Sequence, residues 1–184
     1  MTQWCLPESA TFGGVEYAIN ADYRDVLEII SYLNDVNTPD WLKWQIALAL
    51  FYDEKIPEIY QAEAMNFLSE FIACGEDEET PGPKLIDWDH DATAIVADVN
   101  KVAGMEVRSV PFLHWWTFIA FFRAIGEGQL ATLVSIRQKL AKGKALEKWE
   151  QDFYVSNKSR VELPKYYTSA ELREREELNK LLGE

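Results

Sequence analysis

This sequence of 184 residues is poor in the side chains that most enzymes use for acid–base and nucleophilic chemistry. It has two histidines and two cysteines, and it lacks a phosphate-binding glycine loop and a nucleophile elbow. Cys74 falls on an apolar helical face, which favours a buried thiol over a disulfide with Cys5. We therefore expect a protein that is not an enzyme and uses no cofactor.

Long apolar runs and basic side chains are also scarce. The main apolar tract, between Pro111 and Gly126, covers about fifteen residues, fewer than the ~20 of a membrane-spanning helix. The first residues lack the basic and apolar regions of a signal peptide. The net charge of −13 repels phosphate backbones. We expect a cytoplasmic protein that binds neither membranes nor nucleic acid.

Charge is divided unevenly between the two halves of the chain. Residues 1–100 hold 20 acidic and 4 basic side chains, a net −16, whereas residues 101–184 hold 11 acidic and 14 basic, a net +3. Such asymmetry favours head-to-tail self-association, so we expect a homo-oligomer. One basic stretch is interpreted as a solvated helix face with candidate partner-binding residues: Arg137, Lys139, Lys142, Lys144 and Lys148.

Helical periodicity dominates the pattern of apolar residues and predicts an all-α fold, mainly a helical bundle. The exception is residues 11–20, where alternation around Gly13-Gly14 predicts a small N-terminal β-hairpin. The predicted helices cover residues 22–33, 38–50, 57–74, 91–103, 109–126, 129–141, 143–154 and 168–182. In the second, Thr38 is the expected cap and Pro39 the first helical residue.

The domain organisation follows from one break and one weak helix. Acidic residues and prolines near 76–83 predict an exposed linker inside a single helical domain over residues 1–164. Residues 165–184 form a charged C-terminal helix that Thr168 and Glu171 open with a capping box. Its apolar stripe is thin, which is typical of a mobile tail or of a helix that requires a partner.

Residues 111–122 are the most informative tract because six of the twelve are aromatic carbocycles. A helix that is apolar on every side must be covered on every side. We expect it to be the central helix of the domain, with Ser109 as its cap and Pro111 in its first turn.

Acidic residues after the linker allow a metal site as a minor alternative. Asp87, Asp89, Asp91 and Asp98 have the spacing of calcium-loop ligands. Ala92 occupies the position of the obligatory glycine, however, so an acid-capped helix start is favoured and no metal is expected. A metal-dependent enzyme would have to combine these residues: Asp87, Asp89, His90, Asp91 and His114. For His114, a core histidine hydrogen-bonded to the backbone is favoured.

Several tracts together resemble a bacteriophage and prophage family. They are residues 113–118 (Leu-His-Trp-Trp-Thr-Phe), 85–91 (Leu-Ile-Asp-Trp-Asp-His-Asp), 135–139 (Ser-Ile-Arg-Gln-Lys) and 19–24 (Ile-Asn-Ala-Asp-Tyr-Arg). The chain is similar over about residues 12–164 to the gene-product-fifteen family, which is encoded in the tail-morphogenesis region of long-tailed phages. The resemblance marks residues that we interpret as structural: His114, Trp115, Trp116, Phe118, Trp88, Asp22 and Arg24. Asp22 and Arg24 are expected to tie the hairpin to the first helix.

The resemblance implies a function in tail assembly. The family is similar to tail assembly chaperones, which are oligomeric, coat the tape measure protein and recruit tail-tube subunits without catalysis. The implied partners are therefore the tape measure protein, the tail-tube protein and further copies of the chain itself. The implied location is the cytoplasm of the bacterial host, with absence from the mature virion. The alternative is a structural tail or head–tail joining component that stays in the virion.

Overall fold

The computed structural model describes residues 4–76 and 82–182. It is mainly helical with a two-stranded antiparallel hairpin, which confirms the predicted fold class. The hairpin and first helices are β1 (Ser9–Phe12), β2 (Val15–Ala18), α1 (Tyr23–Asn34), α2 (Asp40–Phe51), the 3-10 helix η1 (Glu58–Tyr60) and α3 (Gln61–Ile72). The remaining elements are α4 (Ala92–Ala103), the 3-10 helix η2 (Val107–Ser109), α5 (Trp115–Arg123), α6 (Gln129–Ala141), α7 (Lys148–Ser156), α8 (Lys158–Val161) and α9 (Ser169–Leu182).

The hairpin turns where the sequence predicts it. Gly13 and Gly14 have φ angles of 58° and 81°, the left-handed backbone that a tight two-residue hairpin turn requires. A side chain at Gly13 would also collide with the ring of Tyr60. The strands pair from Phe12 opposite Val15 to Ser9 opposite Ala18. The hairpin therefore packs its turn against η1.

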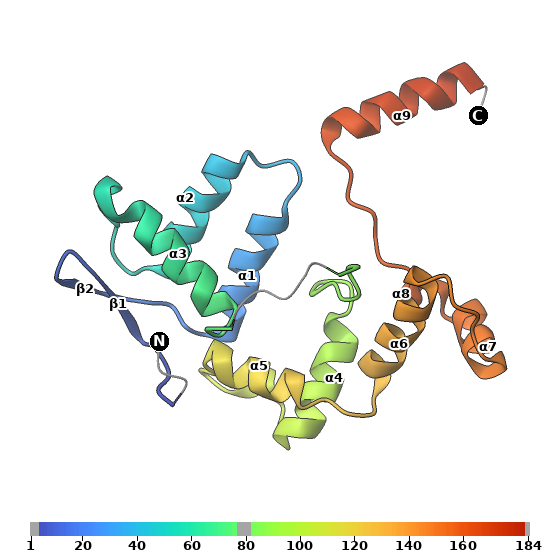
Figure 1. Cartoon of the computed structure of the whole chain (residues 1–184), viewed down its shortest axis with the longest axis horizontal. Helices are drawn as coiled ribbons and strands as arrows, with labels where there is room; N and C mark the ends of the chain where they lie inside the picture. The colour runs from blue at the N-terminus through green and yellow to red at the C-terminus, as the bar shows by residue number, and fades with distance from the viewer. Residues whose placement is uncertain (1–3, 77–81, 183–184) are drawn as a thin grey trace.

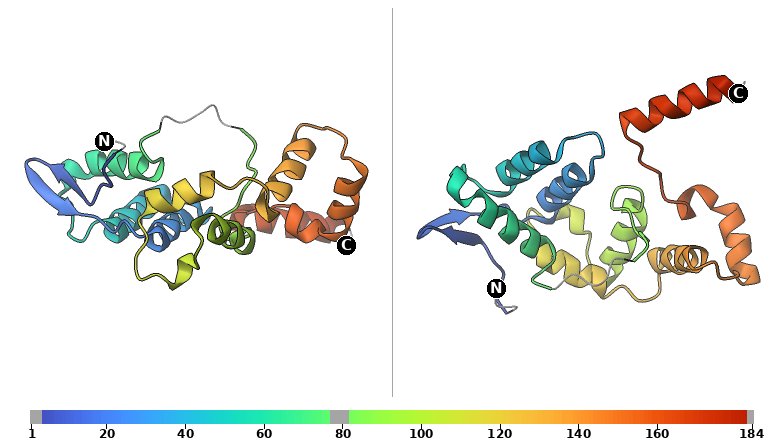
Figure 2. Two further views of the ribbon diagram at one scale, coloured as in Figure 1. Left: turned by 90° about the horizontal axis from the view of Figure 1, so that it is seen from below. Right: turned by 45° about the horizontal axis from the view of Figure 1, so that its top comes forward.

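The elements pack in a row rather than around a single centre. The hairpin contacts α3, followed by α2, α1, α5, α4, α6, α8 and α7, each packed against the one before it. This order places the hairpin and α7 at opposite ends of the long axis (Figure 1), and the views of Figure 2 agree. Among the helices of residues 4–76 and 82–182, none is both long enough and apolar enough to cross a bilayer.

One hydrophobic core joins the parts of the chain before and after the predicted linker. Tyr23 of α1 stacks on Phe118 of α5 with ring centroids 4.5 Å apart and planes inclined by 11°. Phe71 of α3 lies 6.0 Å from Trp116 of α5. Of the predicted linker at 76–83, residues 77–81 lie outside the described residues.

Three predicted helix starts are wrong. The helix predicted from residue 143 is α7, which begins at Lys148 because residues 144–147 are not helical. The aromatic helix begins at Trp115 with His114 as its cap, whereas Ser109 ends η2 and Pro111 precedes the helix. The helix is therefore shorter than predicted, and Ala120 on one side of it is exposed. In α2 the cap residue is Pro39, because the Thr38 hydroxyl donates to Asp35 in the preceding turn.

Candidate functional site

His114, one of the residues that the family resemblance marks, is buried and joins two segments of the chain. The backbone N–H of Trp116 donates to His114 Nδ1 over 3.0 Å, which caps the first turn of α5. His114 Nε2 lies 3.0 Å from the carbonyl oxygen of Pro7. Because Nδ1 accepts, the proton is on Nε2 and the ring is neutral. The histidine thus joins the N-terminal segment to α5, as expected for a core histidine bonded to backbone.

The indoles of Trp115 and Trp116 are hydrogen-bonded to the C-terminal end of α3. Trp115 Nε1 donates to the carbonyl of Ile72 over 3.0 Å, and Trp116 Nε1 donates to the carbonyl of Phe71 over 2.9 Å. These carbonyls belong to the last turn of α3, beyond which no helical N–H follows, and the carbonyl of Phe71 also accepts the Cys74 N–H over 3.0 Å. Trp115 is 1% exposed. The pair therefore fixes α3 onto α5 while burying large apolar surfaces.

Trp88 and Phe118 complete this aromatic cluster. Trp88 lies 5.9 Å from Trp115 and 5.0 Å from Phe122 between ring centroids. Phe118 is buried between Tyr23 and Trp115, with the second pair of centroids 5.9 Å apart. The segment that precedes α4 is thereby packed on α5, so these marked residues serve the core.

Asp22 and Arg24 join α1 to the entry of α5, and not the hairpin to α1 as expected. Asp22 caps α1, and its carboxylate accepts the Leu113 N–H over 2.9 Å as well as Arg24 Nε over 2.7 Å. Arg24 also donates to the carbonyls of Val110 and Pro111. Burial alone would raise the pKa of Asp22, but the hydrogen bonds from Arg24 and Leu113 hold it below its ordinary value.

Acidification should weaken the His114 bridge. Burial lowers the pKa of His114 from 6.5, and this effect exceeds the opposing effect of its bond to Pro7. The unfolded chain therefore takes up this proton at a higher pH than the folded chain does. The stabilisation is fully present above pH 6.5 and is lost as the pH falls below that value.

The substitution His114→Asn tests this pH dependence. Asparagine keeps a capping oxygen for the Trp116 N–H but does not titrate. We expect the melting temperature of the native chain to fall between pH of about 7 and about 5 more steeply than that of the variant. Parallel pH slopes for the two proteins, measured by circular dichroism, would contradict this role for His114.

Most acids of the metal alternative are bound by other groups of the protein, while Asp89 is exposed. Asp91 forms a two-pronged ion pair with Arg137, at 2.6 and 2.7 Å. Asp98 accepts the backbone N–H of Leu130 over 2.8 Å and thereby caps the start of α6. Within residues 4–76 and 82–182, no three His, Cys, Asp or Glu side chains are grouped as metal ligands would be. Asp91 and Asp98 therefore join α4 to α6.

The predicted basic face divides into internal and exposed residues. Arg137 is wrong as a partner-binding residue, because its side chain is 5% exposed and also donates to the carbonyls of Leu85, Arg160 and Val161. Lys139 binds the buried Glu150 over 2.7 Å, which ties α6 to α7. Lys142, Lys144 and Lys148 are exposed. These three remain candidates for contact with a partner.

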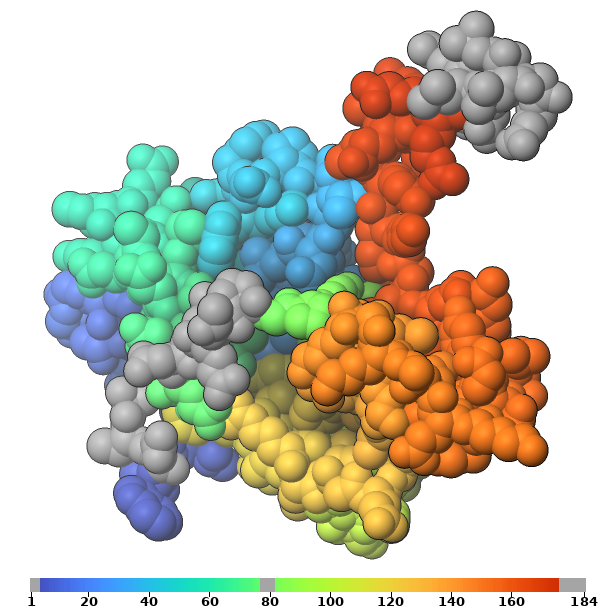
Figure 3. Space-filling model, turned by 45° about the vertical axis from the view of Figure 1, so that its right-hand side comes forward, coloured from blue at the N-terminus to red at the C-terminus, as the bar shows by residue number. Residues whose placement is uncertain are grey.

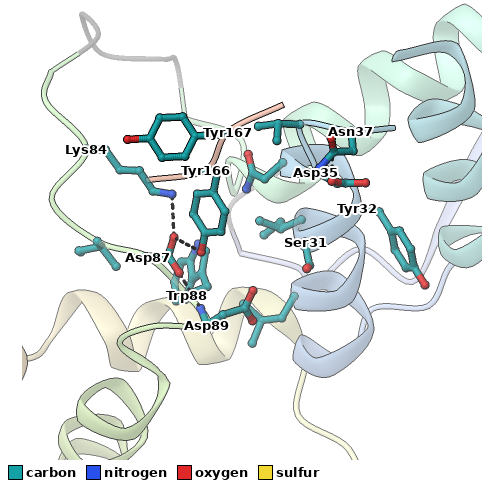
Figure 4. A pocket seen from close by; sticks show the side chains of 15 residues that line it. Ser31, Tyr32, Asp35, Asn37, Lys84, Asp87, Trp88, Asp89, Tyr166 and Tyr167 are labelled. Atoms are coloured by element: carbon teal, nitrogen blue, oxygen red, sulfur yellow. Dashed lines mark hydrogen bonds and ion pairs between the residues drawn. The ribbon is translucent and has the colours of Figure 1, made fainter. Parts of the chain in front are cut away.

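A groove of about 690 Å³ lies between α1, residues 84–89 and the tyrosines that lead into α9 (Figure 4). Leu27 and Ile30 of α1 face Ile86 and Trp88 across it, and these four side chains are partly buried. Polar side chains surround this apolar lining: Ser31, Asn34, Asp35, Asn37, Lys84, Asp87 and Asp89. An apolar groove with polar groups at its edge is typical of a site that binds another molecule.

The groove also anchors the C-terminal arm, by which we mean residues 164–182. Tyr166 Oη donates to Asp87 over 3.1 Å, and Lys84 binds the same carboxylate over 2.8 Å while lying 5.2 Å from the Tyr166 ring. Burial would raise the pKa of Asp87, but hydrogen bonds from the His90 N–H, Lys84 and Tyr166 lower it to about 2. Figure 4 shows Tyr166 pointing toward this acid.

Beyond the two tyrosines the arm contacts the body again at Ser169. The backbone N–H and hydroxyl of Ser169 donate to Asn37 over 2.9 and 2.8 Å. Thr168 and Glu171 form the predicted capping box that opens α9. Residues 171–175 are exposed, and in the described part of the chain no helix or strand forms an extensive interface with α9 (Figures 1 and 3).

Sequence reasoning missed the groove, although one local signal pointed to the arm. Tyr166 and Tyr167 stand between Pro164 and a helix start, where aromatic side chains usually indicate a contact. Lys84 and Asn37, in contrast, are unremarkable residues of linker and turn. Their partners lie 82 and 132 residues away in sequence, so no local pattern could identify them.

Comparison with known protein families gives a match over most of the chain. A family model described as Bacteriophage Gp15 protein matches residues 4–163. No curated protein and no solved structure matches the chain. The matched range includes the hairpin, α1 to α8 and every residue that the sequence resemblance marked, and it ends before the tyrosines of the arm.

Proposed function

Because the chain belongs to the bacteriophage Gp15 protein family, and is thus a phage structural or morphogenesis protein, we propose that it is a tail assembly chaperone. In this proposal it binds the tape measure protein and tail-tube subunits in the host cytoplasm and is absent from the mature virion. It acts as an oligomer and without catalysis. The observation that carries the proposal is α9, a helix that leaves the body and whose described side chains, those of residues 169–175, are exposed.

An unsupported helix of this length requires a partner surface. α9 has 14 residues, and isolated helices of about 12–15 residues are marginal in water. Leu172, on its first turn, is 47% exposed. A long helical partner such as a tape measure offers apolar stripes on which an amphipathic helix can pack. Repeated along such a partner, modest contacts add up to stable coating.

Co-expression with the tape measure protein tests this function. We expect the tape measure to become more soluble and to elute together with this chain from a size-exclusion column. The variant Leu172→Glu should weaken the complex, since it places a charge on the helix face proposed to pack on the partner. Met105→Glu is the matched control, because Met105 is 41% exposed on another part of the body.

Two results would argue against the chaperone. If the tape measure is no more soluble and no complex survives chromatography, the proposed partner is wrong. If mass spectrometry of purified virions finds this chain in stoichiometric amounts, a retained structural tail or head–tail joining component is the better description. If both variants still form the complex, the chaperone function is supported but α9 is not the site that binds the tape measure.

A further inference from the structure

The two ends of the elongated body carry opposite charge. We call the first the hairpin end; it consists of β2 and residues 53–59, which lie side by side. The Asp53 N–H donates to the Ala18 carbonyl over 3.2 Å, and Tyr60 lies against the hairpin turn. Its exposed residues comprise the acids Glu16, Asp53, Glu54 and Glu58, one lysine, Lys55, and the apolar Val15 and Ile59.

The opposite end is the α6–α7 corner, which comprises residues 140–149. Its exposed residues include three cations, Lys142, Lys144 and Lys148, the large apolar residues Leu140 and Trp149, and one acid, Glu147. Lys139 lies 3.8 Å from Glu147, and Trp149 Nε1 donates to Glu147 over 2.9 Å, so this acid is already engaged. The corner therefore presents positive charge around exposed apolar side chains.

Both surfaces combine exposed apolar residues with charged residues, as specific protein interfaces do. Ile59 is 80% exposed at the hairpin end, and Trp149 is 55% exposed at the corner. Large exposed aromatic and aliphatic residues are the usual anchors of an interface. Figures 1 and 2 place the hairpin and α7 at opposite extremes in every view, so one molecule does not join its own two surfaces.

We propose that copies of this chain associate head to tail, with the α6–α7 corner of one copy against the hairpin end of the next. The inference rests on the proposed function in one respect, since a chaperone that coats a long partner acts in multiple copies. Charge complementarity fixes the orientation and speeds encounter, and burial of Ile59 and Trp149 supplies the attraction. A contact between two different surfaces closes into a ring or continues as a filament.

Sedimentation velocity of the purified full-length chain, without tape measure, tests the association. The sedimentation coefficient should rise with protein concentration at low salt, and this rise should diminish at high salt because exposed charges are screened. The triple variant Lys142→Glu, Lys144→Glu, Lys148→Glu should remain monomeric over the same range. The control Lys101→Glu, Lys158→Glu, Lys165→Glu changes the net charge equally at exposed cations outside the corner and should associate like the native chain.

A charge-swap mixture gives the decisive result. The variant Asp53→Lys, Glu54→Lys, Glu58→Lys should also be monomeric alone, because both of its ends are positive. Mixed with the corner variant, it should restore association, since each end then meets the opposite charge. If the corner variant associates as the native chain does, the inference is wrong. It is also wrong if the mixture of the two variants stays monomeric.

The two proposals can fail separately. Head-to-tail association is measured on this chain alone, whereas the chaperone function is measured by recovery of the tape measure. A native chain that stays monomeric at all concentrations but solubilises the tape measure would refute the association and support the function. A chain that associates but recovers no tape measure would support the head-to-tail association and refute the chaperone function.

Discussion

Replacing Arg137 with methionine is expected to lower the free energy of unfolding by about 3–5 kcal/mol, the usual cost of leaving one partner of a buried ion pair alone. Methionine retains most of the stem but none of the five donors. Asp91, whose side chain is 1% exposed, would remain buried without its cation. The carbonyls of Leu85, Arg160 and Val161 would lose their donors as well.

The control comes from the same basic stretch. Lys142→Met removes an equal charge from an exposed residue five positions later, and we expect a change within about 0.5 kcal/mol. The double variant Asp91→Asn, Arg137→Met should lose less free energy of unfolding than the two single variants lose together, because no buried charge is left unpaired. Urea denaturation of five proteins measures these values: the native chain, the single variants Arg137→Met, Lys142→Met and Asp91→Asn, and the double variant. Equal stability of the two methionine variants would contradict the assigned burial of Arg137.

Replacing Trp115 with alanine is expected to cost about 3–5 kcal/mol, since an indole that is 1% exposed is removed from the middle of the aromatic cluster. Phenylalanine at the same position keeps much of the volume but loses the donor to Ile72, so Trp115→Phe should cost about 1 kcal/mol from the lost hydrogen bond plus a packing cost.

Trp41 supplies the control for the tryptophan experiment. It is 69% exposed at the start of α2, and Trp41→Ala should change the stability by about 0.5 kcal/mol or less. The same chemical deletion is thus compared at a buried and an exposed position. If Trp115→Ala unfolds at the same urea concentration as Trp41→Ala, the tract does not form the core.

Local signals predicted most of the fold. The spacing of Val26, Ile29 and Leu33 indicated α1. Asp91 and Gly104 are the residues at the two ends of α4, as the sequence predicted. Short-range hydrogen bonds and periodic burial determine such features, so neighbouring residues contain the information. The Gly13-Gly14 turn was predictable for the same reason, since it needs positive φ angles.

Long-range contacts account for the errors. The start of α5 is set where Ala21, Asp22 and Tyr23 pair with residues 113–115, about ninety positions away. Local cap preferences therefore favoured Ser109 over His114. Arg137 had a signal that was missed, because it lies four residues after Leu133 and three before Leu140, on the apolar face of α6. An arginine on such a face indicates a buried acidic partner, here Asp91.

In the candidate site, too, the features that depend on neighbouring residues were predictable and those that depend on distant residues were not. The capping box of α9 was visible in residues 168–171, and the exposure of residues 169–175 agrees with the thin apolar stripe of the helix. The groove that anchors the arm was not visible, because it forms only when α1, residues 84–89 and Tyr166 meet. Surfaces built from distant segments are set by tertiary packing, and sequence periodicity does not describe them.

Hydrogen exchange of the amides in α9 tests whether this helix is the element that binds the tape measure protein. In the free chain, residues 169–182 should exchange much faster than the buried helix α1, because an unsupported helix opens easily. Addition of the tape measure protein should slow exchange in α9 while α1 is unchanged. If α9 exchanges at the same fast rate in the complex, or is already as protected as α1 without a partner, the arm is not the element that binds.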